Sequence, residues 1–381
     1  MSAPSSGRAS GREPVRVALD VLGGDGAPGV VVDAVPLILQ RSPGVHLVLV
    51  GPIDEIRLGL TSVGIDLDAD PRLSVMASTR AVSMMDDPLK GVRTQHDVSV
   101  RVGSECVRDG RAEAFVTVGH TGAAVAAATW FLGRLPGVSR SPLAVVVPSL
   151  NGRVVLLDVG AAPTDVSADE LLTHAVLGVA YAETLQAVDD PSSVQAVQVG
   201  LLTIGSEPGK GDALRIAAGA ALELAAPGLA FDYVGGIEGH DVAIGGVADV
   251  VVTDGFTGNV LLKGLEGAAA WGAVVFGGAY ETPEPAREAL REIQAGPFAA
   301  GLLLGIRGVV VVGHGASSAE SVASCVALAA RAVRDQVPER VDRRLSAWRG
   351  ESTSNSNGHH ASRPSSDRDS GRPTDSVESL S

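Results

Sequence analysis

The sequence predicts an α/β domain in which helices cover both faces of a mostly parallel sheet. Three observations support this fold class. Short runs rich in Val, Ile and Leu recur between residues 15 and 335, Ala-rich stretches of helical length separate many of them, and glycine turns follow several of the runs. Buried parallel strands have continuous apolar sequences, and strands that alternate with helices pair in parallel through crossover connections.

The predicted strands are short, and each contains the β-branched residues that suit a buried sheet. In chain order they span residues 15–21, 46–50, 115–118, 143–147, 154–157, 197–204, 250–253 and 309–312. The clearest predicted helices are Ala-rich and span residues 170–186, 212–225, 258–276 and 317–334. Pro283 and Pro285 open a charged stretch, which predicts a helical excursion near residues 260–300, either a lobe or a dimer arm.

Composition divides the chain into four regions. Residues 1–14 are mostly Ser, Gly, Arg and Pro, and residues 351–381 contain 10 Ser. Both regions are predicted to be disordered tails, because they hold too few apolar residues to build a core. Residues 15–335 form the predicted domain, and residues 336–350 form a charged C-terminal extension.

The net charge limits the class of partner. The chain has 30 Lys and Arg against 44 Asp and Glu, a formal charge of −14. Such a surface repels polyphosphate backbones at long range, so nucleic acid is not an expected partner. A small anion such as phosphate remains compatible with this charge, because a few backbone amides and one or two cations suffice to bind it.

The lack of a secretory signal and the small number of cysteines favour a cytosolic protein. Cys106 and Cys325 are too few for a disulfide framework or a Cys-rich zinc site, which favours a reducing compartment. The N-terminus lacks the apolar segment of a secretory signal. The apolar run at residues 114–133 has nearly the length of a membrane span. Its His120, Thr121 and three glycines favour a strand, a turn and a helix instead.

The first glycine turn follows the strand at residues 15–21. Gly24, Gly26 and Gly29 match the spacing of the dinucleotide-binding fingerprint, which leaves an NAD-linked dehydrogenase as one alternative. The fingerprint also requires an acidic residue at the end of the next strand, and that strand ends at Gly51. An anion or hydroxyl site is the simpler expectation for this turn.

Similar glycine turns follow four other predicted strands, and a further one lies near the end of the domain. The carboxyl ends of parallel strands meet at one edge of a sheet, so we expect one crevice lined by backbone amides and helix N-termini. Each glycine on its own is equally compatible with a tight connection and nothing more. The residues expected to bind substrate or phosphate are Asp20, Gly23, Gly24, Asp25, Gly119, Thr121, Gly122, Asp158, Gly160, Gly205, Glu207, Gly211, Gly255, Phe256, Thr257, Gly258 and Ser317.

Six side chains at these turns are candidates for chemistry: His120, Lys210, Asp254, Asn259, Lys263 and His314. The two histidines can polarise a carbonyl or accept a proton near neutral pH, with ordinary structural histidines as the alternative. Lys210 and Lys263 suit contact with a phosphate or carboxylate. Asp254 and Asn259 have helix capping as their alternative.

Several catalytic motifs are absent from the sequence. It contains no G-x-S-x-G elbow and no H-E-x-x-H, so neither a hydrolase nucleophile nor a metal site is expected. Lys210 does not belong to a Walker A loop, because Gly211 stands where that loop has Ser or Thr. The predicted chemistry therefore depends on positioning and on backbone amides that stabilise developing negative charge.

Taken in order, the motifs resemble one family. VALDVLGGDGAP, MDDPLKGVR, VTVGHTGAAVAAA, GRLPGVSRSPLAVVVP, LLDVGAAPTDVSADELLTHAVLGVAYA, VGLLTIGSEPGKG, YVGGIEGHDV, DVVVTDGFTGNVLLKGLEG and GVVVVGHGASSAES follow the order and spacing of the bacterial phosphate acyltransferase (PlsX) family over about residues 15–335. The resemblance implies a Rossmann-like three-layer α/β/α fold, a homodimer, and no metal or nucleotide cofactor.

The resemblance also implies an activity and partners. It implies transfer of a fatty acyl group from acyl carrier protein to inorganic phosphate, giving acyl phosphate for phosphatidic acid and phospholipid synthesis. A glycerol-3-phosphate acyltransferase is the implied downstream partner. The implied location is the cytoplasm, with peripheral contact to the inner face of the cell membrane.

The sequence departs from the family pattern at four positions, which are Gln95, Val98, His120 and Ala162. The family usually has Lys and Ser at the first two positions and Asn at the other two, whereas Asp97 and Ser99 match it. These departures support a second hypothesis, a diverged protein that binds acyl carrier protein or a membrane partner without turnover.

Overall fold

The computed structural model describes residues 13–82, 87–162, 165–189, 195–207, 209–279 and 300–358 of the 381-residue chain. Within these ranges, residues 273, 276–279 and 351–358 are described by their backbone alone.

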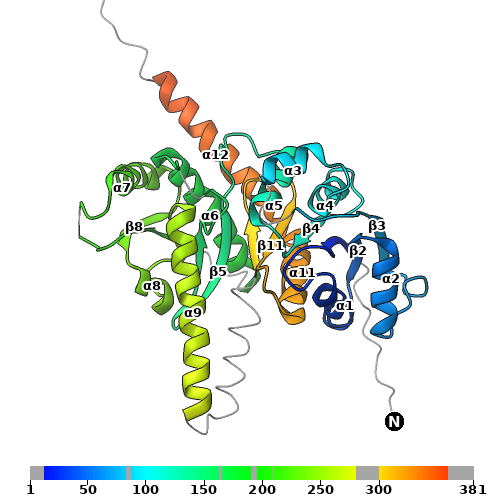
Figure 1. Ribbon diagram of the computed structural model, residues 1–381. Helices are drawn as coiled ribbons and strands as arrows, with labels where there is room; N and C mark the ends of the chain where they lie inside the picture. The colour runs from blue at the N-terminus through cyan, green and yellow to red at the C-terminus, as the bar shows by residue number, and fades with distance from the viewer. Residues whose placement is uncertain are drawn as a thin grey trace, which may run out of the picture.

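A single sheet of 11 strands runs through the described part of the chain (Figure 1). The strands are β1 (Val15–Asp20), β2 (Val45–Gly51), β3 (Leu73–Ala77), β4 (Ala114–Thr117), β5 (Leu143–Ser149), β6 (Gly152–Leu157), β7 (Gln198–Leu202), β8 (Asp232–Ile237), β9 (Val250–Val252), β10 (Ala300–Leu303) and β11 (Val309–Gly313). Their order across the sheet is β3-β2-β1-β4-β11-β10-β5-β6-β9-β7-β8.

The sheet consists of two parallel halves that run in opposite directions. β3, β2, β1, β4 and β11 are parallel to one another, and so are β6, β9, β7 and β8. β5 and β6 form an antiparallel hairpin in which Ser149 pairs with Gly152. β10 is antiparallel to both β11 and β5. Because a hairpin reverses the chain, every strand parallel to β6 runs opposite to β5 and to the first half.

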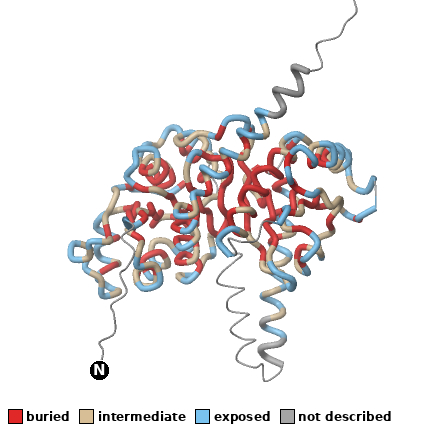
Figure 2. The backbone as a smooth tube through the Cα atoms, turned by 180° about the vertical axis from the view of Figure 1, so that it is seen from behind, coloured by how far each residue is buried: buried red, intermediate tan, exposed pale blue. Residues whose placement is uncertain are grey.

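Helices cover both faces of the sheet and confirm the predicted three-layer α/β/α fold. One face packs against α1 (Gly29–Arg41), α2 (Ile53–Ser62), α6 (Ala168–Asp189), α7 (Ala213–Ala225), α11 (Ala319–Arg334) and α12 (Val337–Gly358). The other face packs against α3 (Pro88–Thr94), α4 (Ser99–Arg108), α5 (Thr121–Ala127), α8 (Gly239–Ile244) and α9 (Gly255–Ala279). A π-helical turn (Ala128–Leu132) follows α5, and a short 3₁₀ helix (Ala226–Gly228) follows α7. Figure 2 shows the buried residues concentrated in the sheet and on the inner faces of these helices.

All predicted strands and the four predicted Ala-rich helices are present. The run at residues 114–133 forms β4, a turn and α5, as expected. α9 extends away from the body of the domain (Figure 1), in agreement with the predicted excursion. The remainder of that excursion, residues 280–299, lies outside the described residues. Among the described helices, α6 has the length and hydropathy of a membrane span, but 72% of its apolar window is buried inside the domain.

The C-terminal boundary differs from the prediction. α12 occupies the predicted charged extension and continues through eight residues of the predicted Ser-rich tail, to Gly358. Val341 and Leu345 of α12 are buried against the domain. Packing stabilises these first turns. Each further residue that joins the helix then gains a backbone hydrogen bond without a new nucleation step. Residues 1–12 and 359–381 lie outside the described residues.

Candidate functional site

A crevice crosses the middle of the sheet, where turns from both halves meet. Two adjoining cavities form it and share Asp25, Gly119 and Gly315. The first is also lined by Asp20, Leu22, Gly23, Gly24, Ala81, Val82, Ser99, Val100 and His120. The second is also lined by Thr121, Leu143, Val145, Val159, Gly160, Asn259, Leu262, Lys263, Gly301, Val312, Gly313, His314 and Ala316. The two cavities together are termed the central crevice.

The expectation that all glycine turns lie at one edge of the sheet was wrong. β1, β4 and β11 end at one edge, whereas β6, β9 and β7 end at the opposite edge, because the β5–β6 hairpin reverses the strand direction. The turns after β1, β4 and β11 nevertheless line the same crevice as the turn after β6. The crevice runs across the face of the sheet between the two edges, over Gly301 of β10 and Val145 of β5.

The turn after β7 lies apart from the central crevice. A separate cavity between β7, β8 and α7 is lined by Gly205, Glu207 and Lys210. Gly211, in the same turn, lies beside Arg215 of α7. The structure therefore separates these four predicted binding residues from the other turns. The cause is again the reversed half of the sheet, in which β7 is separated from the crevice by β6 and β9.

Glycines allow the turns after β1, β4 and β11 to form one continuous wall. Gly24 has a φ of +95°, which favours glycine, and a Cβ on Gly23 would lie 2.9 Å from the nitrogen of Gly119. The amide of Asp25 donates a 2.7 Å hydrogen bond to the carbonyl of Gly315. Backbone from three strand ends thus lies along the same side of the crevice.

Asp20 lies in the first cavity at the end of β1 and is 1% exposed. Its carboxylate accepts hydrogen bonds from Thr117 Oγ1 at 2.8 Å and from the amide of Leu22 at 3.0 Å. Burial raises the pKa of Asp20, and these hydrogen bonds only partly oppose the increase. A carboxyl group with a raised pKa beside a cavity suits proton transfer.

His120 is the N-cap of α5. Its Nδ1 accepts hydrogen bonds from the amides of Gly122 at 3.0 Å and Ala123 at 3.4 Å. An Asn side chain caps a helix in the same way, so His120 retains the capping function of the Asn expected from the resemblance. The structural alternative for His120 is therefore present, although the ring also lines the crevice.

Two other departures from the family pattern also have structural roles. Val98 is fully buried, in the cluster beneath α4, and Gln95 is the C-cap of α3. Asp97 accepts hydrogen bonds from Thr79 and from Arg80, the latter at 3.1 Å. The segment therefore keeps its fold with an apolar residue at position 98.

Asp158 is not available to a substrate, contrary to expectation. Its fully buried carboxylate accepts hydrogen bonds from four backbone amides, at 2.7–3.0 Å. Their donors are Leu143, Gly160, Ala161 and Ala162. Asp158 thus shapes the turn after β6, and among these residues only Leu143 and Gly160 line the crevice.

The carboxylate of Asp254 is also occupied by partners within the protein and does not face a ligand. It accepts hydrogen bonds from the amide and hydroxyl of Thr257, at 2.9 and 2.7 Å, and pairs with Arg215. Burial raises the pKa of Asp254, but these hydrogen bonds and the Arg215 charge outweigh it, so the pKa lies below its ordinary value. Arg215, which links α7 to the start of α9, was not predicted from the sequence.

The remaining predicted residues at the start of α9 have different environments. Asn259 lines the crevice opposite Gly160, whereas Phe256 is 64% exposed and does not line it. A Cβ on Gly258 would lie 2.0 Å from the carbonyl oxygen of Asp158, and one on Gly255 would lie 2.6 Å from that of Ala162. These two glycines let α9 pack on the turn after β6, so their role is contact between backbones.

Lys263, His314 and Glu266 form a cluster at the second cavity. Lys263 Nζ lies 2.9 Å from His314 Nδ1 and 2.8 Å from Glu266 Oε2. His314 Nε2 lies 2.7 Å from Glu266 Oε1. Ser317 donates a 2.6 Å hydrogen bond to the carbonyl of His314 and so stabilises its turn. Glu266 was missed, although its position three residues after Lys263 on one helix is a spacing that brings side chains together.

Lys263 is the only Lys or Arg among the described residues that line the central crevice. The crevice thus combines one ammonium group with exposed backbone from four strand ends, a combination suited to a small anion. Across the described ranges, no group of three or more His, Cys, Asp or Glu is placed to hold a metal ion.

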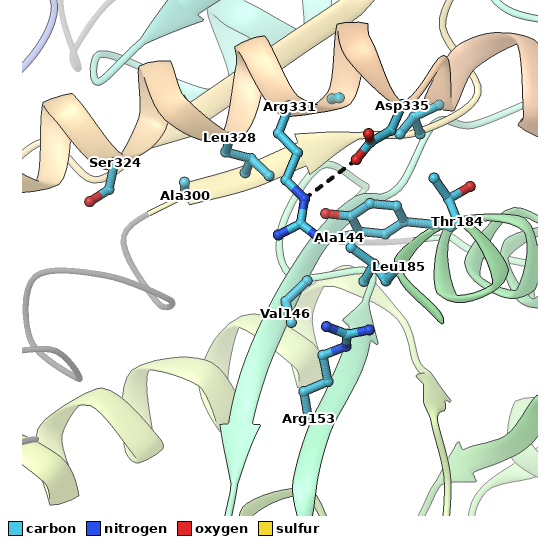
Figure 3. A pocket seen from close by; sticks show the side chains of 13 residues that line it. Ala144, Val146, Arg153, Thr184, Leu185, Ala300, Ser324, Leu328, Arg331 and Asp335 are labelled. Carbon is cyan, nitrogen blue, oxygen red and sulfur yellow. Dashed lines mark hydrogen bonds and ion pairs between the residues drawn. The ribbon is translucent and has the colours of Figure 1, made fainter. Parts of the chain in front are cut away.

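Another cavity lies on the opposite face of the sheet, between α6 and α11 (Figure 3). Ala144, Val146 and Ala300 line it from the sheet, and Arg331 at its edge forms an ion pair with Asp335 at 3.4 Å. None of the residues predicted from the turns lines this cavity, so the central crevice is the candidate functional site.

Sequence comparison identifies relatives along most of the chain. The family described as "Fatty acid synthesis protein" matches residues 15–340. A phosphate acyltransferase from Thermobifida fusca is 37% identical over 355 residues, covering 90% of this chain and 94% of that protein. A phosphate acyltransferase from Thermus thermophilus is 39% identical over 344 residues, covering 87% of this chain and 99% of that protein.

Solved structures with a similar fold include a phosphotransacetylase from Streptococcus pyogenes, with a TM-score of 0.54 and 19% identity over 84% of this chain and 94% of that chain. The EutD phosphotransacetylase from Staphylococcus aureus has a TM-score of 0.51 and 16% identity, with the same two coverages. At these identities the likeness concerns the fold alone.

Proposed function

The chain belongs to the fatty acid synthesis protein family, and from this premise we propose that it transfers a fatty acyl group from acyl carrier protein to inorganic phosphate. The curated relatives named above are phosphate acyltransferases, which supports phosphate as the acceptor. The observation that carries the proposal is the placement of Lys263, the one Lys or Arg among the described residues that line the glycine-rich crevice.

The proposed reaction needs no nucleophile from the protein. Phosphate binds beside Lys263, and one of its oxygens attacks the thioester carbonyl carbon. The new C–O bond places the carbonyl electron pair on oxygen as an oxyanion. The oxyanion then collapses and the C–S bond breaks, so that the electron pair leaves with the carrier's sulfur, which takes up a proton from solvent or from the attacking hydrogen phosphate. Backbone amides at the strand ends stabilise the oxyanion, and a few such donors in a water-restricted site lower the barrier by several kcal/mol.

The oligomeric state, location and downstream partner of the protein complete the proposal. We propose a cytoplasmic homodimer in peripheral contact with the inner face of the cell membrane, whose acyl phosphate passes to a glycerol-3-phosphate acyltransferase for phospholipid synthesis. The family resemblance supports these parts, and the exposed apolar side chains of Trp271 and Val274 on α9 support a dimer or membrane contact.

The test is incubation of the purified protein with long-chain acyl carrier protein and phosphate, followed by trapping of acyl phosphate with hydroxylamine. Phosphate-dependent product is the expected result. A parallel reaction with acyl coenzyme A tests whether the carrier protein is the required donor. Binding of acyl carrier protein without product would instead support the diverged binding protein. The dehydrogenase alternative lacks an acidic residue at the end of β2, which ends at Gly51.

A further inference from the structure

We infer that Glu266 is a positioning residue of the phosphate site, which holds the Lys263 ammonium and the His314 imidazole in one arrangement. This inference rests on the proposed function.

The cluster connects the two halves of the crevice. Lys263 and Glu266 lie on α9, which follows β9 in the second half of the sheet, whereas His314 lies in the turn after β11 in the first half. Glu266 contacts both partners, with Oε2 on Lys263 at 2.8 Å and Oε1 on His314 at 2.7 Å. A single carboxylate thus joins α9 to the opposite wall.

The contacts define how the three groups are held. Glu266 Oε2 accepts a hydrogen bond from Lys263 Nζ at 2.8 Å, and Nζ also lies 2.9 Å from Nδ1 of His314. Glu266 Oε1 lies 2.7 Å from His314 Nε2, in an orientation that forms no hydrogen bond. Glu266 therefore restrains the ammonium directly, contacts the His314 ring, and accepts one of the three N–H groups of Lys263. A further N–H group of that ammonium is available to a phosphate oxygen.

Burial distinguishes this cluster from an ordinary surface ion pair. The side chain of Glu266 is 22% exposed, compared with 49% for Lys263 and 37% for His314. Burial by itself raises the pKa of Glu266, but the contacts with His314 and Lys263 outweigh it, so the pKa lies below its ordinary value. The carboxylate is thus ionised at neutral pH and is the least exposed group of the cluster.

An unsupported Lys side chain at this position would sample many rotamers. Ordering it when phosphate binds costs conformational entropy, which a pre-formed contact removes in advance. The negative charge of Glu266 repels phosphate, and the ordering of Lys263 and His314 outweighs that repulsion.

The first experiment compares Glu266→Gln with the wild-type protein. We expect the KM for phosphate to rise about tenfold, the size of effect typical for loss of one charge-assisted hydrogen bond, while kcat at saturating phosphate changes much less. The midpoint of thermal unfolding should stay within a few degrees. Glu55→Gln is the matched control, because it removes the same charge from an exposed position on α2. An unchanged or lower KM in Glu266→Gln would overturn the inference.

The second experiment uses Lys263→Met as the background. If Glu266 acts by positioning Lys263, adding Glu266→Gln to Lys263→Met should change the KM for phosphate by less than about twofold. A full tenfold additional loss would show that Glu266 acts independently, and would overturn the inference. Should Glu266→Gln fail to fold, Glu266→Asp keeps the charge but shortens its reach, and an intermediate KM is expected.

Phosphate binding is also measured without an acyl donor, from the protection that inorganic phosphate gives against thermal unfolding. Protection that is present in the wild-type protein and weaker in Glu266→Gln supports the inference even if no acyl phosphate forms. Absence of acyl phosphate with normal protection therefore counts against the proposed reaction only. Equal protection in the two proteins counts against the role of Glu266.

Discussion

Lys263 and Lys210 place positive charge at two different parts of the domain. Lys263 lines the central crevice, whereas Lys210 lines the cavity between β7, β8 and α7. We expect Lys263→Met to raise the phosphate concentration for half-maximal acyl phosphate formation by at least tenfold, because the crevice loses its cation. Lys210→Met should leave that concentration within about twofold. The reverse pattern in steady-state assays would move the phosphate site to the second cavity.

His120 combines a capping role with a position beside the crevice. We expect His120→Ala to lower the free energy of unfolding by about 1 kcal/mol, because the amides of Gly122 and Ala123 lose their acceptor. His120→Asn should keep the cap and the activity. Urea unfolding and steady-state assays test both statements, and a His120→Ala variant as stable as the wild-type protein would contradict the capping role.

At the scale of elements, Gly258 determines how closely α9 approaches the end of β6. We expect Gly258→Ala to lower the free energy of unfolding by about 2–3 kcal/mol, because its Cβ would lie 2.0 Å from the Asp158 oxygen and the helix must move. Gly258 was expected from the sequence to bind substrate or phosphate, whereas the structure gives it a packing role. Gly264→Ala is the control on the same helix, since no atom lies within 4 Å of its added Cβ and helix propensity should improve. Equal stability of the two variants in urea would contradict the packing argument.

The part of α9 beyond the domain body exposes apolar side chains. Trp271 is 66% exposed and Val274 is 74% exposed, on a helix that extends from the domain (Figure 1). We expect these side chains to be covered by a second copy of the chain, since exposed apolar surface of this kind marks interaction sites. Trp271→Ser combined with Val274→Ser should reduce the mass in solution from dimer to monomer, as measured by light scattering. Loss of liposome binding at an unchanged mass would instead identify a membrane contact. The side chain of Phe276, on the same helix, lies outside the described residues.

At the scale of the whole molecule, the buried His174 of α6 links stability to pH. It is fully buried, with Nε2 3.3 Å from the carbonyl of Arg140. Burial lowers the pKa of His174, and the nearby Asp158 charge and the Arg140 carbonyl only partly oppose the decrease. The folded protein therefore binds this proton less readily than the unfolded chain does, so stability is lost as the pH falls below the ordinary imidazole value of about 6.5.

Proton linkage limits how much His174 can change the free energy of unfolding for each pH unit. One proton bound only in the unfolded state lowers the free energy of unfolding by at most about 1.4 kcal/mol per pH unit. We expect His174→Gln to show a shallower decline than the wild-type protein in urea unfolding between about pH 6.5 and 5. His240→Gln, at an exposed position on α8, should leave the decline unchanged. Equal slopes in wild type and His174→Gln would assign the acid sensitivity to other groups.

Much of the fold is predictable from local patterns. Every predicted strand and the four predicted Ala-rich helices are present, because buried strands and Ala-rich helices leave their signature within a few consecutive residues. β3 and β10 were missed because LSVMA and AGLL contain at most one β-branched residue, and β8 was missed because Gly235 and Gly236 interrupt its apolar pattern. α12 extends beyond its predicted boundary because its first turns are stabilised by packing against the domain, which the sequence of those turns does not reveal.

The candidate site is predictable in part, for a different reason. The glycine turns after β1, β4 and β11 could be identified one by one, and they meet as expected. Asp158 and Asp254 were chosen for their chemistry, but their oxygens are committed to backbone amides and Arg215. A carboxylate at a strand end has the same sequence signature in both roles, so only its neighbours distinguish them.

By itself the sequence determined the layered α/β class, the family resemblance and the turns from which a site is built, because each depends on residues close together in the chain. Only the tertiary structure decided which of those turns face one another. The β5–β6 hairpin reverses half of the sheet, which excludes Lys210 from the central crevice and brings α9 across to the turn after β11. The Lys263, His314 and Glu266 cluster forms there because strand direction, which depends on pairing between distant segments, places residues 51 positions apart within hydrogen-bonding distance.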